Sequence, residues 1–490
     1  MSAMSDDGTR GVVLVGLGPH SRRIYYPALA AHAARERLRL ALLVELEDQK
    51  DTVERFLAGQ PLQPEQIVYV PTSYRDGATL SDAFVAAGEL ARRRGLWGAV
   101  VATEPKSHLV YARWALRNGL HVLLDKPITG TNLFNAEPRE ALRLVDDFVE
   151  LSGLASRSGR KVLVQTQRRA HLGYELVHAY LVEFLGAFEV PISYVDLYHA
   201  DGMWNMPSEY VTRENHPYKY GYGKLMHSGY HFVDLFASLV SLNQQLSIAP
   251  DRVEMTVRHV RPTDHMAQVH DGVHRWFFGA DRDRFPADPS ELRGYGEVDA
   301  FLLMQLLRGD EVMTTGALSL LQTSFSRRAW PRLPADTYKG NGRVRHERVT
   351  IQVGPLLSIQ VHSYQSYEAK DWIANTAGAG SYEHFDIYFF RNSALVGGPA
   401  FDSVTLGDAS RHRRHVEQGY LGHNEAARTE VFRDFLNEDA GRAGLASHEL
   451  PVKLTAATYY SMLRLNREGR PGSQVSLVPG DPAWFLPGAA

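Results

Sequence analysis

Cysteine is absent from the 490-residue sequence, which excludes disulfide bonds, thiolate metal sites and cysteine nucleophiles. A strong charge of either sign is also missing, because 53 Lys and Arg residues nearly balance 56 Asp and Glu residues, for a net charge of −3. This balance favours neither nucleic acid nor an anionic membrane as a partner. No apolar run approaches the ~18 residues of a membrane span, and residues 1–10 are polar, without a signal-peptide pattern. We therefore expect a cytoplasmic protein.

The sequence does contain enough apolar material for two folded cores. Its hydrophobic fraction is 44%, a value typical of globular proteins. Single cores stop growing at roughly 250–300 residues. We therefore expect two domains, residues 1–165 and residues 166–490.

Short β-branched apolar runs alternate with helical stretches through the first domain. The helical spacing of apolar residues is clearest at 107–118 and 139–152. We expect strands at 12–15, 38–44, 67–70, 99–103, 121–124 and 161–165. Such an alternation forms a doubly wound parallel sheet, which binds ligands at the carboxyl ends of its strands. The sequence therefore predicts an α/β domain of the Rossmann type.

The second domain has longer β segments and fewer alternations. We expect helices at 174–185, 224–240, 425–437 and 454–468, and strands at 192–198, 300–307 and 317–326. The last two strands flank a turn-like segment at 308–311. This pattern predicts an α+β domain with a large, mostly antiparallel open sheet, and the two closing helices are candidates for packing back on the first domain.

A glycine-rich turn directly follows the first strand. Residues 16–21, Gly-Leu-Gly-Pro-His-Ser, fit the G-x-G-x-x-small loop that lets a pyrophosphate approach backbone N–H groups, and an ordinary strand-to-helix turn is the alternative. Glu45 ends the second strand, where a carboxylate binds the adenosine ribose of NAD and repels the 2′-phosphate of NADP. Arg22 or Arg23 would favour NADP instead if either paired with that phosphate. Pro27 predicts a late start or a kink in the first helix.

Three further motifs occur in order along the chain. Residues 103–108, Thr-Glu-Pro-Lys-Ser-His, form a Thr-containing turn with a histidine five residues on, and residues 125–127 read Asp-Lys-Pro. Residues 223–234, Gly-Lys-Leu-Met-His-Ser-Gly-Tyr-His-Phe-Val-Asp, fit G-x-L-x-D-x-G-x-H-x-x-D except that His227 replaces the aspartate. Together these motifs resemble the Gfo/Idh/MocA family, the group of glucose–fructose oxidoreductase and inositol dehydrogenase, which has Glu-Lys-Pro in place of Asp-Lys-Pro. The likeness spans most of the chain.

The motifs and the resemblance together imply roles for individual residues. Those on the cofactor side are Gly16, Gly18, Pro19, His20, Ser21, Glu45, Thr103, Glu104, His108, Asp125 and Lys126. Those on the substrate side are Arg168, Tyr222, His227 and His231, although Arg168 and Arg169 are equally well explained as a solvated pair. Lys126, His231 and His227 are the expected catalytic residues, with Lys126 orienting the substrate and transferring its proton and His231 acting as acid or base.

This set suits hydride transfer from a carbinol carbon. The hydride leaves only as the hydroxyl proton is removed, so the site needs a base and a cation that stabilises the developing alkoxide. We expect His227 and His231 to titrate as a coupled pair with at least one ring neutral. Their i, i+4 spacing also suits a metal, with His199 and Asp201 as further ligands, whereas the resemblance implies a site without metal.

The sequence therefore predicts an NAD-dependent oxidoreductase, with NADP as the less favoured cofactor. Its expected substrate is a sugar, a cyclitol or a nucleotide-linked sugar, and the basic run 412–415 is either a phosphate site or a solvated surface. The alternatives are redox-neutral elimination or glycoside cleavage assisted by NAD, a sensor without catalysis, and a metal-dependent hydrolase. The resemblance also implies a homodimer or a homotetramer.

Overall fold

The chain divides into two compact units. The computed structural model describes residues 9–33, 38–73, 82–332, 342–366, 378–381, 384–406 and 423–488. Unit 1 consists of Met1–Thr131, Arg143–Ala170 and Glu425–Val452, and unit 2 consists of Asn132–Leu142, His171–Asn424 and Lys453–Ala490. The boundary expected after residue 165 thus falls close to the end of a unit 1 segment. The helix expected at 425–437 returns to unit 1, whereas the one expected at 454–468 belongs to unit 2.

Unit 1 contains a parallel sheet. Its described strands are β1 (Arg10–Val15), β2 (Leu38–Leu46), β3 (Ile67–Val70), β4 (Gly98–Val101), β5 (His121–Leu124) and β6 (Val162–Val164). Their order is β3-β2-β1-β4-β5-β6, and every pairing between them is parallel. β4 and β5 are buried along their whole length, as expected for strands covered on both faces. The predicted doubly wound Rossmann sheet is confirmed.

The first helix of unit 1 is interrupted, as Pro27 predicts. The described helices are α1 (Pro19–Arg23), α2 (Tyr25–Ala33), α3 (Lys50–Leu57), α4 (Asp82–Arg93), α5 (Pro105–Arg117), α6 (Arg143–Ser158) and α15 (His423–Leu436). The break falls at Ile24, which places Pro27 in the first turn of α2, where its missing N–H costs no hydrogen bond. α15 joins this unit because Val431, Phe432 and Phe435 are buried in its core.

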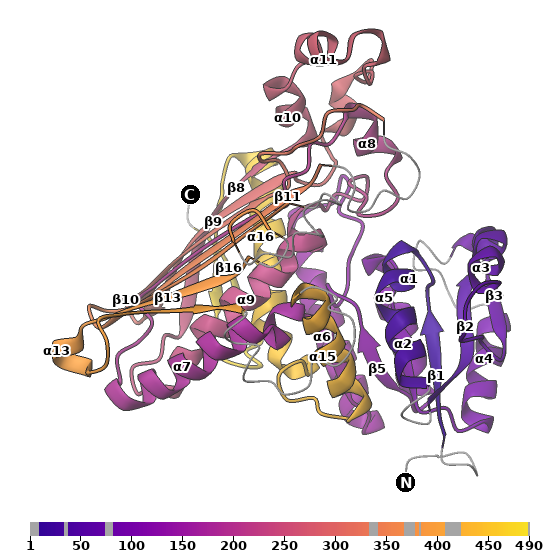
Figure 1. Cartoon of the computed structure of the whole chain (residues 1–490), viewed down its shortest axis with the longest axis horizontal. Coiled ribbons are helices and arrows are strands. Elements are labelled where there is room, and N and C mark those ends of the chain that lie inside the picture. The colour runs from indigo at the N-terminus through magenta and orange to yellow at the C-terminus, as the bar shows by residue number, and fades with distance from the viewer. Residues whose placement is uncertain are drawn as a thin grey trace. The chain divides into compact units, whose positions relative to one another are not determined.

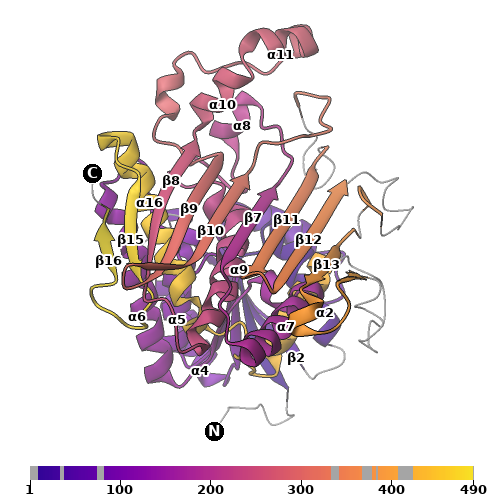
Figure 2. The ribbon, with the colours of Figure 1, turned by 90° about the vertical axis from the view of Figure 1, so that its left-hand side faces the viewer.

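Unit 2 contains a larger sheet. Its described strands are β7 (Tyr194–Ala200), β8 (Arg252–Val260), β9 (Asp299–Arg308), β10 (Glu311–Leu321), β11 (Val344–Val353), β12 (Leu357–Ser366), β13 (Asp386–Arg391), β14 (Phe401–Thr405), β15 (Gly472–Ser476) and β16 (Phe485–Pro487). Their order is β14-β13-β12-β11-β7-β10-β9-β8-β15-β16, and Figure 2 shows most of them side by side. β7 and β10 pair in parallel and the other described pairs are antiparallel. The predicted mostly antiparallel sheet is confirmed.

Helices cover one face of this larger sheet. The described helices of unit 2 are α7 (Leu172–Phe188), α8 (Pro207–Thr212), α9 (Tyr230–Val240), α10 (Pro262–Gln268), α11 (Asp271–Phe278), α13 (Ser393–Val396) and α16 (Glu449–Glu468, whose first turn belongs to unit 1). α7, α9 and α16 lie along the sheet, and α10 and α11 lie beyond one end of it (Figure 1). The turn expected at 308–311 contains only Gly309 and Asp310, so β10 begins and ends earlier than predicted. Among the described helices, none is long and apolar enough to cross a bilayer.

Candidate active site

The glycine loop of unit 1 leaves space in front of α1. Gly16 has φ +87°, and a Cβ there would lie 2.7 Å from the carbonyl oxygen of Ala102, so the fold requires glycine at this position. A Cβ on Gly18 would meet no atom within 4 Å. The side chain of Ser21 is buried beneath this turn. The loop therefore fits a pyrophosphate, because Gly18 keeps open a space that the fold itself does not fill.

Glu45 lies at the carboxyl end of β2 and contacts the glycine loop. Its Oε2 accepts a hydrogen bond of 2.6 Å from the backbone N–H of Leu17, and its Oε1 accepts one of 2.8 Å from Leu46. Burial raises the pKa of this carboxyl, while the two N–H groups and the charge of Arg22 act in the opposite direction. The structure thus brings Glu45 together with the predicted pyrophosphate loop.

The predicted motifs at 103–108 and 125–127 are joined by His108. Its Nδ1 lies 2.7 Å from the carbonyl oxygen of Pro127, and its Nε2 lies 3.0 Å from that of Thr103. The ring is fully buried, and burial lowers its pKa. His108 therefore holds the turn after β4 against the turn after β5, whereas the side chains of Thr103 and Glu104 are partly exposed.

Asp125 and Lys126 follow β5 at the same edge of the sheet as the glycine loop. Asp125 accepts a hydrogen bond of 2.9 Å from the backbone N–H of Lys126, and its other oxygen lies 3.6 Å from Nε2 of His20. Burial lowers the pKa of His20 to about 3, although Asp125 opposes this effect, so the imidazole is neutral near pH 7. The side chain of Lys126 is partly exposed. This edge therefore presents an amine beside a carboxylate and a neutral imidazole.

Arg168 is buried, so the solvated-pair explanation is wrong for this residue. It follows β6 in a 3-10 turn (Gln167–Ala170) and is 1% exposed. The neighbouring Arg169 is partly exposed and donates to the carbonyl oxygens of Arg442, at 2.9 Å, and Ser447, at 3.0 Å. The two arginines therefore have different environments.

In unit 2, His227 lies in a π-helical turn rather than in a regular α-helix. The turn spans Leu225–Gly229 and runs directly into α9, whose first turn contains His231. The helix expected over 224–240 therefore begins with a π-turn, and a shared face for the two histidines stays a prediction. Such turns occur frequently at functional sites. Both side chains are buried, at 4% and 5% exposure.

The His227 ring is surrounded by other rings. Its centroid lies 4.8 Å from that of His216, 5.5 Å from Tyr218 and 6.0 Å from Tyr222. Tyr218 and Tyr222 are almost completely buried. The predicted residues Tyr222 and His227 therefore lie together in one aromatic cluster of unit 2.

The π-turn is held in place by Lys224, which the sequence analysis did not single out. Its Nζ lies 2.9 Å from Nδ1 of His199 and donates to Oδ2 of Asp201 at 2.6 Å and to Oγ of Ser228 at 2.8 Å. Asp201 also pairs with Arg343. All three donors of the ammonium are used. His199 and Asp201, considered above as metal ligands, instead bind this lysine.

A buried carboxyl caps the start of the same helical segment. Oε1 of Glu297 accepts hydrogen bonds from the backbone N–H of Leu225, at 2.7 Å, and from the hydroxyl of Tyr459, at 3.1 Å. Burial raises the pKa of Glu297 from 4.5 to about 7. The folded protein therefore favours the protonated form, and stability falls as the pH rises from the ordinary glutamate pKa through about 7.

Replacing Glu297 with glutamine should remove this pH dependence, because the amide oxygen still accepts from Leu225 and has no charge. One pKa unit corresponds to ~1.36 kcal/mol, so at pH 8 the variant should exceed the parent by about 3 kcal/mol in free energy of unfolding, while near pH 5 the difference should be small. Urea titrations at both pH values measure this. An exposed control, Glu311→Gln, should show no such change, and a parallel pH dependence of Glu297→Gln and the parent would refute the assignment.

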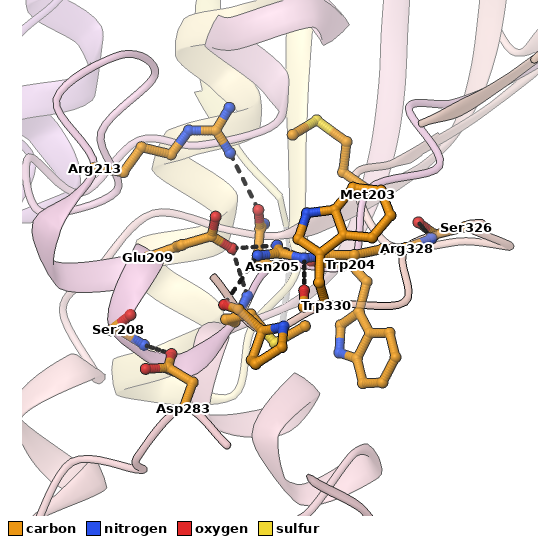
Figure 3. A network of polar contacts seen from close by, with 12 residues as sticks. Met203, Trp204, Asn205, Ser208, Glu209, Arg213, Asp283, Ser326, Arg328 and Trp330 are labelled. Carbon is orange, nitrogen blue, oxygen red and sulfur yellow. Dashed lines mark hydrogen bonds and ion pairs between the residues drawn. The ribbon is translucent and has the colours of Figure 1, made fainter. Parts of the chain in front are cut away.

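The segment before the π-turn, residues 203–222, contains several aromatic side chains and is fixed by Arg328 (Figure 3). Its Nη1 donates to the carbonyl oxygen of Trp204 at 2.7 Å and to Oε2 of Glu209 at 2.6 Å. In the same segment, Nη1 of Arg213 donates to Oδ1 of Asn205 at 3.1 Å, and Nδ2 of Asn205 donates to the Tyr218 hydroxyl at 3.0 Å. These contacts fix the position of a ring that lies against His227.

Within the described ranges, no group of three His, Asp or Glu side chains is arranged to hold a metal ion. The basic run 412–415 lies outside the described residues.

Comparison with known proteins shows which fold this chain has. The sequence matches no family profile and no curated protein sequence. It is similar in structure to an aldose-aldose oxidoreductase from Caulobacter crescentus crystallised with glycerol (15% identity, 96% of this chain and 100% of that chain, TM-score 0.53). An oxidoreductase from Agrobacterium radiobacter in complex with NAD+, L-tartaric acid and magnesium matches at 11% identity (95% and 98% covered, TM-score 0.53). The WlbA dehydrogenase from Bordetella pertussis in complex with NADH and UDP-GlcNAcA matches at 15% identity (96% and 99% covered, TM-score 0.53). The chain therefore has the two-sheet fold of these oxidoreductases.

Proposed function

We propose that this chain is an NAD-dependent oxidoreductase of the Gfo/Idh/MocA type. It would transfer hydride between the nicotinamide and a secondary alcohol or ketone of a sugar, a cyclitol or a nucleotide-linked sugar. The observation that carries the proposal is the carboxyl edge of the unit 1 sheet. The glycine loop follows β1 there, Glu45 lies at the end of β2, and Lys126 comes after β5. Ligands of doubly wound sheets bind at this edge.

The similar structures support the same assignment. One of them binds NAD+ with a hydroxy acid, and another binds NADH with a nucleotide-linked sugar. Each of the two matches covers nearly the whole of both chains. The order of the motifs at 16–21, 103–108, 125–127 and 223–234 supports the family assignment independently of the fold.

Each unit supplies a defined part of the chemistry. In unit 1 the glycine loop accommodates the pyrophosphate and Glu45 accepts the ribose hydroxyls, while His108 and Asp125 hold the turn that carries Lys126. The bound cofactor supplies the hydride acceptor or donor. Lys126 orients the substrate hydroxyl and moves its proton at Nζ, and its charge stabilises the developing alkoxide. In unit 2, His231 acts as acid or base, and Tyr222 and His227 contribute to substrate binding.

Glu45 should make the protein prefer NAD to NADP, because its carboxylate would lie beside the 2′-phosphate and repel it. Replacing Glu45 with glutamine should reduce this preference, since the amide still accepts from Leu17 but has no charge. Calorimetric titration with both reduced dinucleotides gives the ratio of the Kd values. Tighter binding of NADPH by the parent protein would show that Arg22 or Arg23 controls the choice.

The proposed function is tested by incubating the purified protein with NAD and a panel of sugars, cyclitols and sugar acids. We expect steady accumulation of NADH with at least one hydroxylated substrate and no dependence on a divalent ion after chelator treatment. Substrate conversion without net NADH would favour redox-neutral chemistry. Loss of activity that an added divalent ion restores would favour the metal-dependent hydrolase.

A further inference from the structure

Arg428, on α15, is a buried cation at the ligand-binding edge of the unit 1 sheet. Its side chain is 9% exposed. Within the described residues its guanidinium has one ion-pair partner, Glu425, with 3.6 Å between Nη1 and Oε1, which is longer than a hydrogen bond. An arginine carries five N–H donors, and the single long pair with Glu425 leaves donors for a further acceptor. The side chain therefore has binding capacity that the protein itself does not use.

The course of α15 places Arg428 at the carboxyl edge of the sheet. Gln165 follows β6 at that edge, and its Nε2 donates to the backbone carbonyl oxygen of Arg428 at 3.0 Å. Two turns later, the Phe435 ring lies 4.8 Å from that of Trp97, which precedes β4 at the opposite edge. The helix therefore runs from the carboxyl edge, where ligands bind, to the amino edge.

The positive charge of Arg428 acts on His20, which follows the glycine loop. Burial is the largest cause of the lowered pKa of His20, and the positive charge of Arg428 adds to it. His20 lies in the first turn of α1, directly after the space that Gly18 leaves open. Gln165, which contacts Arg428, follows β6, and β6 and β2 lie on opposite sides of β1 in the sheet. Glu45, at the end of β2, marks the adenosine side in the proposed function.

We propose that Arg428 binds the diphosphate of the dinucleotide, at the phosphate on the nicotinamide side. The assignment rests on the proposed function. Arg428 would be a cofactor contact from the C-terminal part of the chain, beyond the motifs in residues 1–165. A diphosphate provides anionic oxygens in the geometry that a planar guanidinium binds through two parallel hydrogen bonds. The carboxyl edge then gains a cation that offsets the phosphate charge, while Glu425 holds the side chain when no ligand is bound.

The test compares Arg428→Gln with Arg433→Gln, which removes the same charge from an exposed ion pair with Glu430 on the same helix. Each variant and the parent are titrated calorimetrically with NADH, ADP-ribose and AMP. We expect Arg428→Gln to raise the Kd for NADH and for ADP-ribose about 10- to 100-fold, the usual effect of losing a hydrogen bond to a charged group. The Kd for AMP, which lacks the nicotinamide-side phosphate, should be unchanged. Arg433→Gln should resemble the parent with all three ligands.

Thermal unfolding without ligand separates binding from a structural role. Because Arg428→Gln removes a poorly paired buried charge, we expect its Tm to equal or exceed that of the parent, while the rise in Tm caused by NADH becomes smaller. If the glutamine variant does not fold, Arg428→Lys, which keeps the charge but not the paired donors, should still bind NADH more weakly than the parent.

Three results would overturn the inference. Unchanged affinity for NADH and ADP-ribose would show that Arg428 does not touch the cofactor. Weaker binding of NADH alone would place the contact on the nicotinamide, and equal weakening of AMP would place it on the adenosine side. If the parent protein binds none of the ligands, the proposed function fails as well, so the two failures are distinguishable.

Discussion

Replacing Lys126 with alanine should lower turnover about 10²- to 10⁴-fold, the usual contribution of a positioned acid or base, and leave the Kd for NADH nearly unchanged. The physical reason is the position of Lys126. It follows β5 at the carboxyl edge of the unit 1 sheet, while the pyrophosphate loop follows β1 and is built from backbone groups. Single-turnover kinetics and calorimetric titration measure the two quantities separately.

Two further variants make this prediction specific. Lys161→Ala removes the same charge from an exposed position just before β6, at the opposite edge of the sheet, and should leave turnover intact. Lys126→Arg keeps the charge but cannot give up its proton at accessible pH. Slow turnover of Lys126→Arg is expected if proton transfer is essential. If Lys126→Ala turns over like the parent, Lys126 is not a catalytic residue.

Replacing Asp201 with asparagine should lower the free energy of unfolding by about 3–5 kcal/mol, the usual effect of removing one partner from a buried ion pair. Asp201 is 2% exposed and is the counter-charge for Lys224, at 2.6 Å, and for Arg343. Without it, the buried Arg343 loses its counter-charge, and Lys224 and the π-turn lose one of their contacts. Urea unfolding at neutral pH measures the change.

Asp196→Asn is the matched control for this prediction. Asp196 lies on β7, the strand that Asp201 directly follows, but pairs at 3.1 Å with the exposed Arg348. Solvent screening limits such pairs to about 0–1 kcal/mol. Similar destabilisation by the two variants would show that the buried cluster around Lys224 contributes no more than a surface ion pair.

Local sequence patterns were sufficient to predict the two kinds of sheet and the ligand-binding edge of unit 1. The apolar β-branched runs, the loop 16–21 and Pro27 predicted the parallel sheet and a late or kinked first helix, because burial periodicity and proline geometry act over a few residues. Glu45 and Lys126 could be placed at the ligand edge by the same reasoning, since parallel strands bring their carboxyl ends to one side. All of these features depend on neighbours in sequence.

The residues that sequence analysis missed obtain their roles from distant partners. Lys224 meets His199 and Asp201 only because β7 lies beside the π-turn, and Arg428 reaches the carboxyl edge only because α15 returns to unit 1. A signal was present for Arg428, which precedes Val431 and Phe432 by three and four residues and so lies on the buried face of its helix. The π-turn had no such signal, because an α-helix and a π-helix have nearly the same apolar spacing over five residues.

The sequence by itself therefore determined the two kinds of sheet, the glycine loop and the edge at which Glu45 and Lys126 lie, because these follow from short-range periodicity and chain direction. Only the tertiary structure decided the environment of His227, the pairing of Lys224 with Asp201 and the burial of Arg428. Each of these depends on desolvation and on charges brought together across many residues, and such free energies exist only once the distant segments are packed.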